Sequence, residues 1–277
     1  MARTKPHPMP ENPAPSETAI PVVLVFGGAD PTGGAGLQAD IEATASHGCH
    51  AASVVTAVTA QDTTNVVHFT PQPPESVFHQ ARLILEDLEV HAVKIGMLGT
   101  PEIAEAVEVL LAGHSHLPVV LDPVLAAGGG GPLAGEGLAA ALRRLCGRAT
   151  VVTPNGPEAR TLARGADTLH ACAMELLETG ARHVLLTGGH EPGEEVVNTL
   201  YDPRGPVQQW RWPRLPGAFH GTGCTLAATL AARLAQGQPI PEAARIAQEY
   251  TWRSIRHAFR AGRGQCLPDR FHWCRGR

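Results

Sequence analysis

The fold of this chain is decided by the stretch Val22–Gly36, which reads VVLVFGGADPTGGAG. Its five apolar residues, Val22–Phe26, predict a buried strand that ends at two glycines. The next run, Gly36–His47, predicts a helix that ends before Gly48. Strands that alternate with helices in this way are typical of parallel α/β sheets. The glycines let the backbone pass close to a ligand, although the turn matches neither a Walker loop nor a G-x-G-x-x-G fingerprint, and an ordinary tight turn stays open.

The same alternation continues along the chain. Further strands are expected at Ala52–Ala60, Ala92–Ile95, Val119–Leu121, Thr150–Thr153 and His183–Leu186, with a hairpin formed by Asn198–Asp202 and Gln208–Trp212. Helices are expected at Pro74–Leu88, Pro101–Leu111, Leu138–Leu145, Pro157–Ala163, Ala171–Glu178, Cys224–Ala235 and Pro241–Phe259. This order predicts one α/β domain over residues 21–277, with a mostly parallel sheet covered by helices on both faces. Ligands in such sheets bind outside the carboxyl ends of the strands.

Composition narrows the classes of function. Residues 1–20 carry five prolines and few apolar side chains, so we expect a disordered tail. The formal net charge is −4 and no stripe of Lys or Arg is visible, which argues against a nucleic-acid partner. No apolar run is long enough to span a membrane. The six cysteines show no C-x-x-C spacing and no secretory leader is apparent, which favours a cytoplasmic protein.

The run His220–Thr225, with the sequence HGTGCT, precedes an apolar, alanine-rich stretch that predicts a long helix. A helix start offers unpaired backbone N–H groups and the positive end of the helix dipole to an anion. The same field would favour the thiolate of Cys224, one turn into the helix. We therefore interpret the run as an anion cradle with a candidate base. The alternative is a plain helix start with a buried structural thiol.

Three further clusters follow expected strands. Asp122 and the glycine run Gly128–Gly131 suit a metal–phosphate region with a small lid, or a flexible loop. Asn155 and Glu158 suit a helix capping box, and equally suit Mg²⁺ coordination beside a triphosphate. The third cluster, Thr187–His190, fits a nucleotide loop or an ordinary turn.

Six motifs follow one another along the chain and include residues of most of these clusters. They are Gly28–Asp40 (GADPTGGAGLQAD), Thr56–Gln61 (TAVTAQ), Lys94–Leu98 (KIGML), Asp122–Val124 (DPV), Thr153–Glu158 (TPNGPE) and Gly221–Thr225 (GTGCT). Together they resemble the ribokinase-like superfamily, and within it the hydroxymethylpyrimidine/phosphomethylpyrimidine kinases of thiamine biosynthesis. The resemblance runs from about Val22 to the C-terminal region. Cys224 is the discriminating residue, because most other kinases of this superfamily carry Asp there.

The resemblance implies a three-layer αβα sandwich and an ATP- and Mg²⁺-dependent kinase. Its substrate would be 4-amino-5-hydroxymethyl-2-methylpyrimidine and then the monophosphate of that compound. The pyrimidine would be bound through Gln61, helped by Asp40, which could instead be a surface acid, and by packing from Gly28, Met97 and Val124. A homodimer is expected on the same ground.

The resemblance also assigns the transfer chemistry. The backbone N–H groups of Gly221, Thr222, Gly223 and Cys224 would form an anion hole for the transferring phosphoryl group, and Cys224 would take the proton of the substrate hydroxyl. Mg²⁺ would be organised by Asp122 and Glu158, with Asn155 beside them. The adenine nucleotide would lie against Thr187, Gly189, His190 and the final helices.

Two departures from the family pattern concern the nucleotide. Many relatives carry a lysine directly before the Gly-Gly-His segment, and this chain has Thr187 at that position. Many relatives also carry a Lys-Ser-Gly-Asp segment in the lid, which residues 127–131 replace in this chain. The affinity for ATP and the choice of nucleotide are the properties most affected. Two alternatives therefore remain: a pyridoxal or pyridoxine kinase of the same fold, and a catalytically weak regulator that binds a pyrimidine or a nucleotide.

Overall fold

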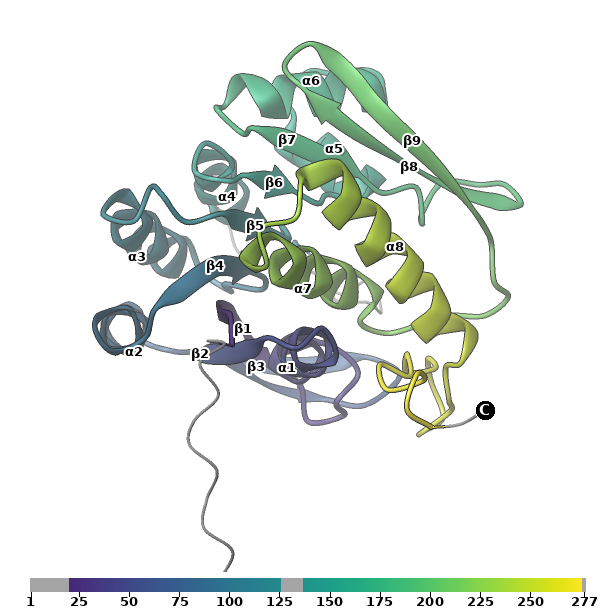
Figure 1. Ribbon diagram of the computed structural model, residues 1–277, viewed down its shortest axis with the longest axis horizontal. Helices are drawn as coiled ribbons and strands as arrows, with labels where there is room; N and C mark the ends of the chain where they lie inside the picture. The colour runs from purple at the N-terminus through teal and green to yellow at the C-terminus, as the bar shows by residue number, and fades with distance from the viewer. Residues whose placement is uncertain (1–19, 126–136, 276–277) are drawn as a thin grey trace, which may run out of the picture.

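The structure is a computed structural model, and it describes residues 20–125 and 137–275. The expected tail at residues 1–19 and the glycine run Gly128–Gly131 lie outside the described residues. Seventeen elements follow one another in the described part (Figure 1).

A nine-stranded sheet forms the middle layer, with the order β3-β2-β1-β4-β5-β6-β7-β8-β9. Six strands run parallel to one another, namely β1, β2, β4, β5, β6 and β7. Strand β3 pairs antiparallel with β2 at one edge, and β8 and β9 continue the sheet antiparallel beyond β7 at the other. The strands are β1 Val22–Ala29, β2 His50–Gln61, β3 Val66–Pro71, β4 Val90–Ile95, β5 Val119–Leu121, β6 Val151–Val152, β7 His183–Leu186, β8 Glu195–Asp202 and β9 Gly205–Pro213.

Helices cover both faces of the sheet, as Figure 1 shows. One layer contains α1 Gly36–Ser46, α7 Thr222–Ala235 and α8 Ile240–Arg256. The other contains α2 Pro74–Asp87, α3 Pro101–Ala112, α4 Leu138–Cys146, α5 Gly156–Leu162 and α6 Leu169–Glu178. The expected α/β class and the three-layer sandwich are confirmed.

Strand β1 separates two cores. Val23 and Val25 pack toward α1, α7 and α8, whereas Leu24 and Phe26 pack toward the other layer. All four side chains are fully buried. Because successive side chains of a strand point to opposite faces, an unbroken apolar run is what a central strand between two helical layers requires. The side chains of this strand thus place the glycine turn that follows it at a fixed edge of the sheet.

Most expected elements are confirmed within one to three residues. The expected hairpin is present, and Thr100 caps α3 through a hydrogen bond from the backbone N–H of Ile103. Strand β3 was not expected. It pairs antiparallel with β2 at the sheet edge.

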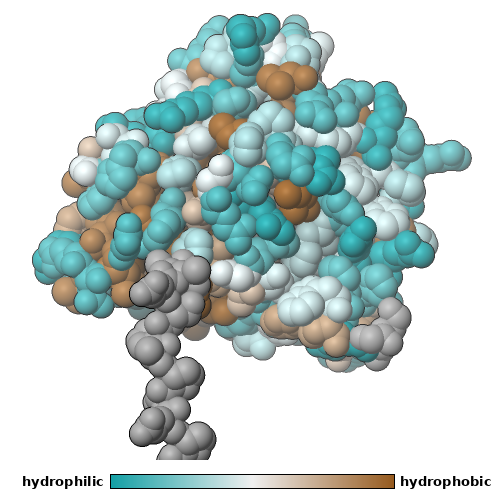
Figure 2. Space-filling view, viewed as in Figure 1, coloured by the Kyte–Doolittle hydropathy of each residue, from teal (hydrophilic) through white to brown (hydrophobic). Residues whose placement is uncertain are grey.

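The outer surface is mostly polar in the view of Figure 2, with apolar side chains gathered around α2 and α3, where Leu83 and Val109 are exposed. None of the helices within residues 20–125 and 137–275 is long and apolar enough to cross a membrane.

Candidate active site

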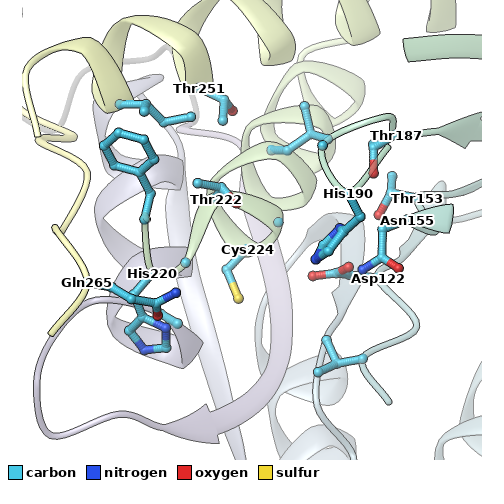
Figure 3. A pocket seen from close by; sticks show the side chains of 18 of the residues that line it. Asp122, Thr153, Asn155, Thr187, His190, His220, Thr222, Cys224, Thr251 and Gln265 are labelled. Carbon is cyan, nitrogen blue, oxygen red and sulfur yellow. The ribbon is translucent and has the colours of Figure 1, made fainter. Parts of the chain in front are cut away.

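A cavity of about 520 Å³ opens at the carboxyl ends of the parallel strands. Each of these strands contributes a wall residue at its end or just after it, and α7 contributes its first turn (Figure 3). The cavity therefore lies where the sequence predicts the ligand site, since crossovers of one hand bring all these ends to the same edge.

The cavity brings together residues from all the clusters that the sequence singled out. Its wall includes Gly28, Gln61, Met97, Asp122, Val124, Asn155, Glu158, Thr187, Gly189, His190, Gly221, Thr222, Gly223 and Cys224. Asp40 differs: within the described part of the chain it lies behind the wall rather than in it. Cys224 lies in the middle of this view, with His220 and Gln265 on one side and His190, Asp122 and Asn155 on the other (Figure 3).

The glycine turn after β1 is organised by Asp30, which the sequence analysis quoted without a role. The buried Asp30 carboxylate accepts hydrogen bonds from the backbone N–H groups of Thr32 and Ala35 and from the Thr32 hydroxyl. His220 lies 2.9 Å from the same carboxylate through its Nε2 atom. Burial alone would raise the pKa of Asp30, but these hydrogen bonds lower it overall. A single ionised carboxylate thus joins the turn to the segment that begins α7.

The first turn of α7 is packed directly against that glycine turn. Gly221 has φ +87°, and a Cβ there would overlap the carbonyl oxygen of Gly34. Gly36 has φ +59°, and a Cβ would overlap the carbonyl of Gly28. Both positions therefore need glycine for conformation and for space. Such close approach leaves the N–H end of α7 open toward the cavity, as an anion cradle requires.

The electrostatics of Cys224 correct one expectation. Burial raises the pKa of its thiol to about 12, which outweighs the lowering by Lys94. Asp40 and Asp122 raise it further, and the backbone N–H of Gly36 lowers it. The resting side chain is therefore a neutral thiol, not the thiolate that its place at a helix start predicted. The helix dipole is overcome because the half-buried thiol is desolvated at the cavity wall and lies near two carboxyl groups.

Lys94 supplies the positive charge at the base of the cavity, a role that the sequence analysis missed. Its ammonium lies 2.8 Å from Asp40 Oδ2, and the two side chains are 1% and 0% exposed. Burial would lower the pKa of Lys94, but Asp40, with Cys224 and Asp122, raises it overall. Burial also raises the pKa of Asp40, and Lys94 counteracts this. Lys94 lines the cavity while Asp40 holds it from behind, so contact between Asp40 and a pyrimidine stays a prediction.

Both functions that the sequence left open for Asn155 and Glu158 find support. The capping box is present: Asn155 Oδ1 accepts from the backbone N–H of Glu158, and Glu158 Oε2 accepts from that of Asn155. Both residues also line the cavity. Burial raises the pKa of Glu158 to about 8, and Asp122 adds to the rise. Burial likewise raises the pKa of Asp122 to about 6, although Lys94 opposes it and Asp40 adds to it.

Asp122 and Glu158 place two carboxyl groups with raised pKa values at the cavity wall, and Asp122 adds to the rise at Glu158. Mg²⁺ prefers oxygen ligands and is commonly held by one or two carboxylates together with substrate phosphates. Asp122 and Glu158 fit this donor set. In residues 20–125 and 137–275 there is no group of three His, Cys, Asp or Glu side chains able to hold a metal by itself.

One end of the cavity is shaped by the loop between β7 and β8, residues 187–194. Arg214 fixes this loop, because its guanidinium donates to the backbone carbonyls of Gly189, Glu191 and Gly193. Asn198 accepts from the N–H of Gly188 and donates to Gln248 on α8. Aromatic and aliphatic side chains line the space beside them, namely Val196, Trp212, Leu226, Trp252 and Ile255. A flat apolar slot next to a fixed loop suits a nucleotide base.

The other end is built from β2, β4 and the residues after β5. Gln61 closes β2 and lines the cavity with Met97 and Val124. The Thr56 hydroxyl donates to the Met97 carbonyl, which fixes the backbone there. A Cβ at Gly28 would lie 3.1 Å from the Met97 sulfur, so glycine leaves room for that side chain. One amide between apolar walls suits a small heteroaromatic ring.

Comparisons with known proteins agree with this geometry. A family model described as phosphomethylpyrimidine kinase matches residues 30–269. The hydroxymethylpyrimidine/phosphomethylpyrimidine kinase of Streptomyces coelicolor is 42% identical over 251 residues, covering 88% of this chain and 92% of that protein. The protein of the same name from Haemophilus influenzae is 36% identical over 264 residues, covering 92% and 97%.

Solved structures share the fold. A phosphomethylpyrimidine kinase from Clostridium difficile matches with a TM-score of 0.72 at 31% identity, over 86% of this chain and 100% of that chain. A Bacillus subtilis pyridoxal kinase, solved as an ADP complex, matches with a TM-score of 0.82 at 28% identity, over 91% and 98%. Backbone similarity therefore extends to both kinds of kinase, whereas the family model and the sequence relatives indicate one of them. The chain belongs to the phosphomethylpyrimidine kinase family.

Proposed function

We propose that the protein transfers the γ-phosphoryl group of ATP to the hydroxymethyl oxygen of 4-amino-5-hydroxymethyl-2-methylpyrimidine, and then to the resulting monophosphate, to give the diphosphate used in thiamine biosynthesis. One observation carries the proposal. A single cavity holds an amide-and-apolar end at Gln61, a loop-and-aromatic end at Thr187–His190, and the N–H end of α7 with Cys224 between them. This is the arrangement that in-line transfer between two bound substrates needs.

Binding and positioning supply most of the catalysis in such a reaction. Gln61 would hydrogen-bond the aminopyrimidine, while Met97 and Val124 would pack on its ring. The N–H groups of the first turn of α7 would receive the charge that develops on the transferring group. Lys94 lies close enough to Cys224 and Asp122 to influence both electrostatically, so it adds positive charge to the same region.

Asp122 and Glu158 would hold Mg²⁺, which, when bound, would supply positive charge that stabilises the negative charge of the phosphates. Their raised pKa values favour this, because a cation compensates two carboxylates that otherwise destabilise each other. Glu158 would keep one oxygen on the backbone N–H of Asn155 and so keep α5 capped.

Cys224 would accept the proton of the attacking hydroxyl, as its thiolate. Because the resting thiol has a pKa of about 12, it would first release its own proton to water in the cavity, and Lys94 and the Gly36 N–H favour the thiolate that results. The transition state of phosphoryl transfer is loose, so the nucleophile keeps its proton until late and a strong base is useful only then. The proton would move from the substrate oxygen to the Cys224 thiolate as the new P–O bond forms, while the bond between the γ-phosphorus and the β-phosphate oxygen breaks and ADP leaves with that electron pair.

The experiment is an ATP-dependent assay of the hydroxymethylpyrimidine, with chromatographic detection of both the mono- and the diphosphate. Pyridoxal is tested in parallel, since the structural similarity to pyridoxal kinase favours it as the second candidate. We expect both pyrimidine phosphates and a loss of about 10²–10⁴-fold in rate for Cys224→Ala. Cys274→Ala, at an exposed cysteine away from the cavity, is the matched control and should keep the wild-type rate. Faster turnover of pyridoxal would assign the second function, and ligand binding without turnover would assign a regulator.

The remaining expectations belong to the same proposal. All six cysteines are free thiols, which is compatible with a reducing cytoplasm. The net charge of −4 favours small-molecule ligands over nucleic acid. A homodimer is proposed from the family resemblance, and sedimentation analysis of the purified protein would test it.

A further inference from the structure

Arg270 lies in the segment that follows α8 and is 2% exposed. An arginine is rarely buried to this degree unless its charge is paired and its donors are bonded. The side chain points into the molecule between α1, α7 and the glycine turn after β1. Its place is therefore set by specific partners.

The guanidinium of Arg270 joins the glycine turn after β1 to the first turn of α7, which carries the anion cradle. Its Nε donates to Thr225 Oγ1 on α7 at 2.9 Å. Its two terminal nitrogens donate to the backbone carbonyls of Gly33 and Gly34. The first of these nitrogens also lies 3.0 Å from a carboxylate oxygen of Glu42 on α1, which balances the charge. Because this one planar group makes hydrogen bonds in three directions, it fixes the glycine turn relative to the first turn of α7.

These contacts lie next to Cys224 and the anion cradle. Gly34, whose carbonyl Arg270 binds, is also the residue against which Gly221 packs. Two residues further on, the N–H of Gly36 interacts with the Cys224 sulfur. Thr225, the acceptor on α7, directly follows Cys224. A shift of Arg270 would therefore move both sides of the anion cradle without touching the substrate ends of the cavity.

Arg270 is itself anchored at its backbone. Its carbonyl accepts hydrogen bonds from the Tyr250 hydroxyl on α8 at 2.6 Å and from the Ser46 hydroxyl at the end of α1 at 2.9 Å. The adjacent Asp269 N–H donates to the Ser254 carbonyl. The guanidinium thus projects from a rigid base, as a group that positions other groups must.

We propose that Arg270 is a positioning residue for phosphoryl transfer, which holds the glycine turn of Gly33 and Gly34 against the first turn of α7 so that the anion cradle and Cys224 keep their geometry. The inference rests on the proposed kinase function. Arg270 contributes through Gly34 and Thr225 and does not itself line the described cavity.

The test compares Arg270→Met and Arg270→Lys with the wild-type chain. A displacement of about 1 Å at a transfer site costs on the order of 10²-fold in rate. We therefore expect kcat to fall by about 10- to 100-fold in Arg270→Met, with the KM for both substrates changed by less than about threefold, because the residues at the two ends of the cavity are untouched. Arg270→Lys keeps the charge but lacks the planar fork, and should lose less.

Loss of folded protein could imitate a lower kcat, so the active fraction is measured for each variant as the stoichiometry of ADP binding in calorimetry. Arg143→Met is the matched control. Arg143 also joins separate helices, through the Leu162 carbonyl and Glu175, but lies outside the cavity. It should lose stability and keep kcat per binding site. If the rate of Arg270→Met per ADP-binding site equals that of the wild type, Arg270 is merely structural and the proposal is wrong.

A second readout does not depend on the reaction. The rate of iodoacetamide labelling at Cys224, relative to the exposed Cys274, is followed by peptide mass spectrometry. Loosening of the glycine turn should raise this ratio in Arg270→Met and leave it unchanged in Arg143→Met. An unchanged ratio in Arg270→Met would overturn the positioning role, even for a protein that fails to phosphorylate the pyrimidine. Absence of pyrimidine turnover in the wild type together with a raised ratio would refute only the proposed function.

Discussion

Replacing Lys94 by Met should destabilise the protein far more than the loss of an ordinary ion pair does. The ammonium of Lys94 and the carboxylate of Asp40 are 2.8 Å apart and almost completely buried. Asp40 Oδ1 has no hydrogen-bond partner among the described residues, so Lys94 is the main compensation for this carboxylate. Methionine preserves much of the apolar stem, and the change therefore removes chiefly the charge.

The magnitude follows from burial. Removing one partner of a buried pair leaves an uncompensated charge, which costs about 3–5 kcal/mol. An exposed pair contributes about 0–1 kcal/mol. Arg82 and Glu86 form such a pair on α2, with side chains 44% and 56% exposed, so Arg82→Met is the matched control. Since whole domains are stable by only about 5–15 kcal/mol, the difference between the two variants is large.

The assay is urea denaturation followed by circular dichroism, which gives the free energy of unfolding. The double variant Lys94→Met/Asp40→Asn removes both charges and should recover at least half of the loss. In Lys94→Met the pKa of Asp40 lies further above its ordinary value, because the opposing ammonium is gone. Protonation then favours the folded state, so the variant should lose stability as the pH rises from about 4 toward the folded pKa. A loss no greater than that of Arg82→Met, or a double variant no more stable than Lys94→Met, would refute the reasoning.

Three other predictions concern the cavity. Because burial raises the pKa of Cys224 to about 12, its alkylation rate should keep rising between pH 9 and 11, where an ordinary thiol levels off; a plateau near pH 9 in a pH series would contradict this. Gln61→Ala should raise the KM for the pyrimidine by about tenfold or more, as expected for a lost hydrogen bond of about 1.5 kcal/mol, with a smaller change in kcat and in the KM for ATP; steady-state kinetics with each substrate varied decides. Glu158 has a folded pKa of about 8 against an ordinary 4.5, so it stabilises the folded state fully below pH 4.5 and this contribution disappears as the pH rises to 8. Glu158→Gln should therefore show a flatter decline of unfolding free energy over that range, and an identical slope would exclude the raised pKa.

Local patterns were sufficient for most of the fold. The run Val22–Phe26 is apolar at every position because it is buried on both faces, and that signal is visible without a structure. Strand β3 lacked such a signal. Its residues Val66–Pro71 are all exposed or half-buried at the edge of the sheet and include a histidine and a proline. Edge strands have weak sequence patterns because only one neighbour and one face constrain them.

Which residues line the cavity could be predicted from the sequence for a geometric reason. Parallel strands end at one edge, so polar residues that follow them meet there, as Asp122, Asn155 and Thr187 do. Charge compensation was not predictable in this way. Asp40 and Lys94 are 54 residues apart and on different elements, and no spacing rule connects them. The helix-start argument for Cys224 was also incomplete, because a field that favours the thiolate competes with burial, which only the folded structure reveals.

The contact between Arg270 and the glycine turn also has a consequence for biosynthesis. Gly34 and Arg270 are 236 residues apart in the chain. At about 5–20 residues per second, a ribosome needs about 12–47 seconds to reach Arg270 after it has made Gly34. Throughout that interval the nascent chain has β1 and the glycine turn that follows it but lacks the guanidinium that holds this turn, and the first turn of α7 is made only late in the interval. The cradle therefore matures last, so partly synthesised chains cannot form the complete site.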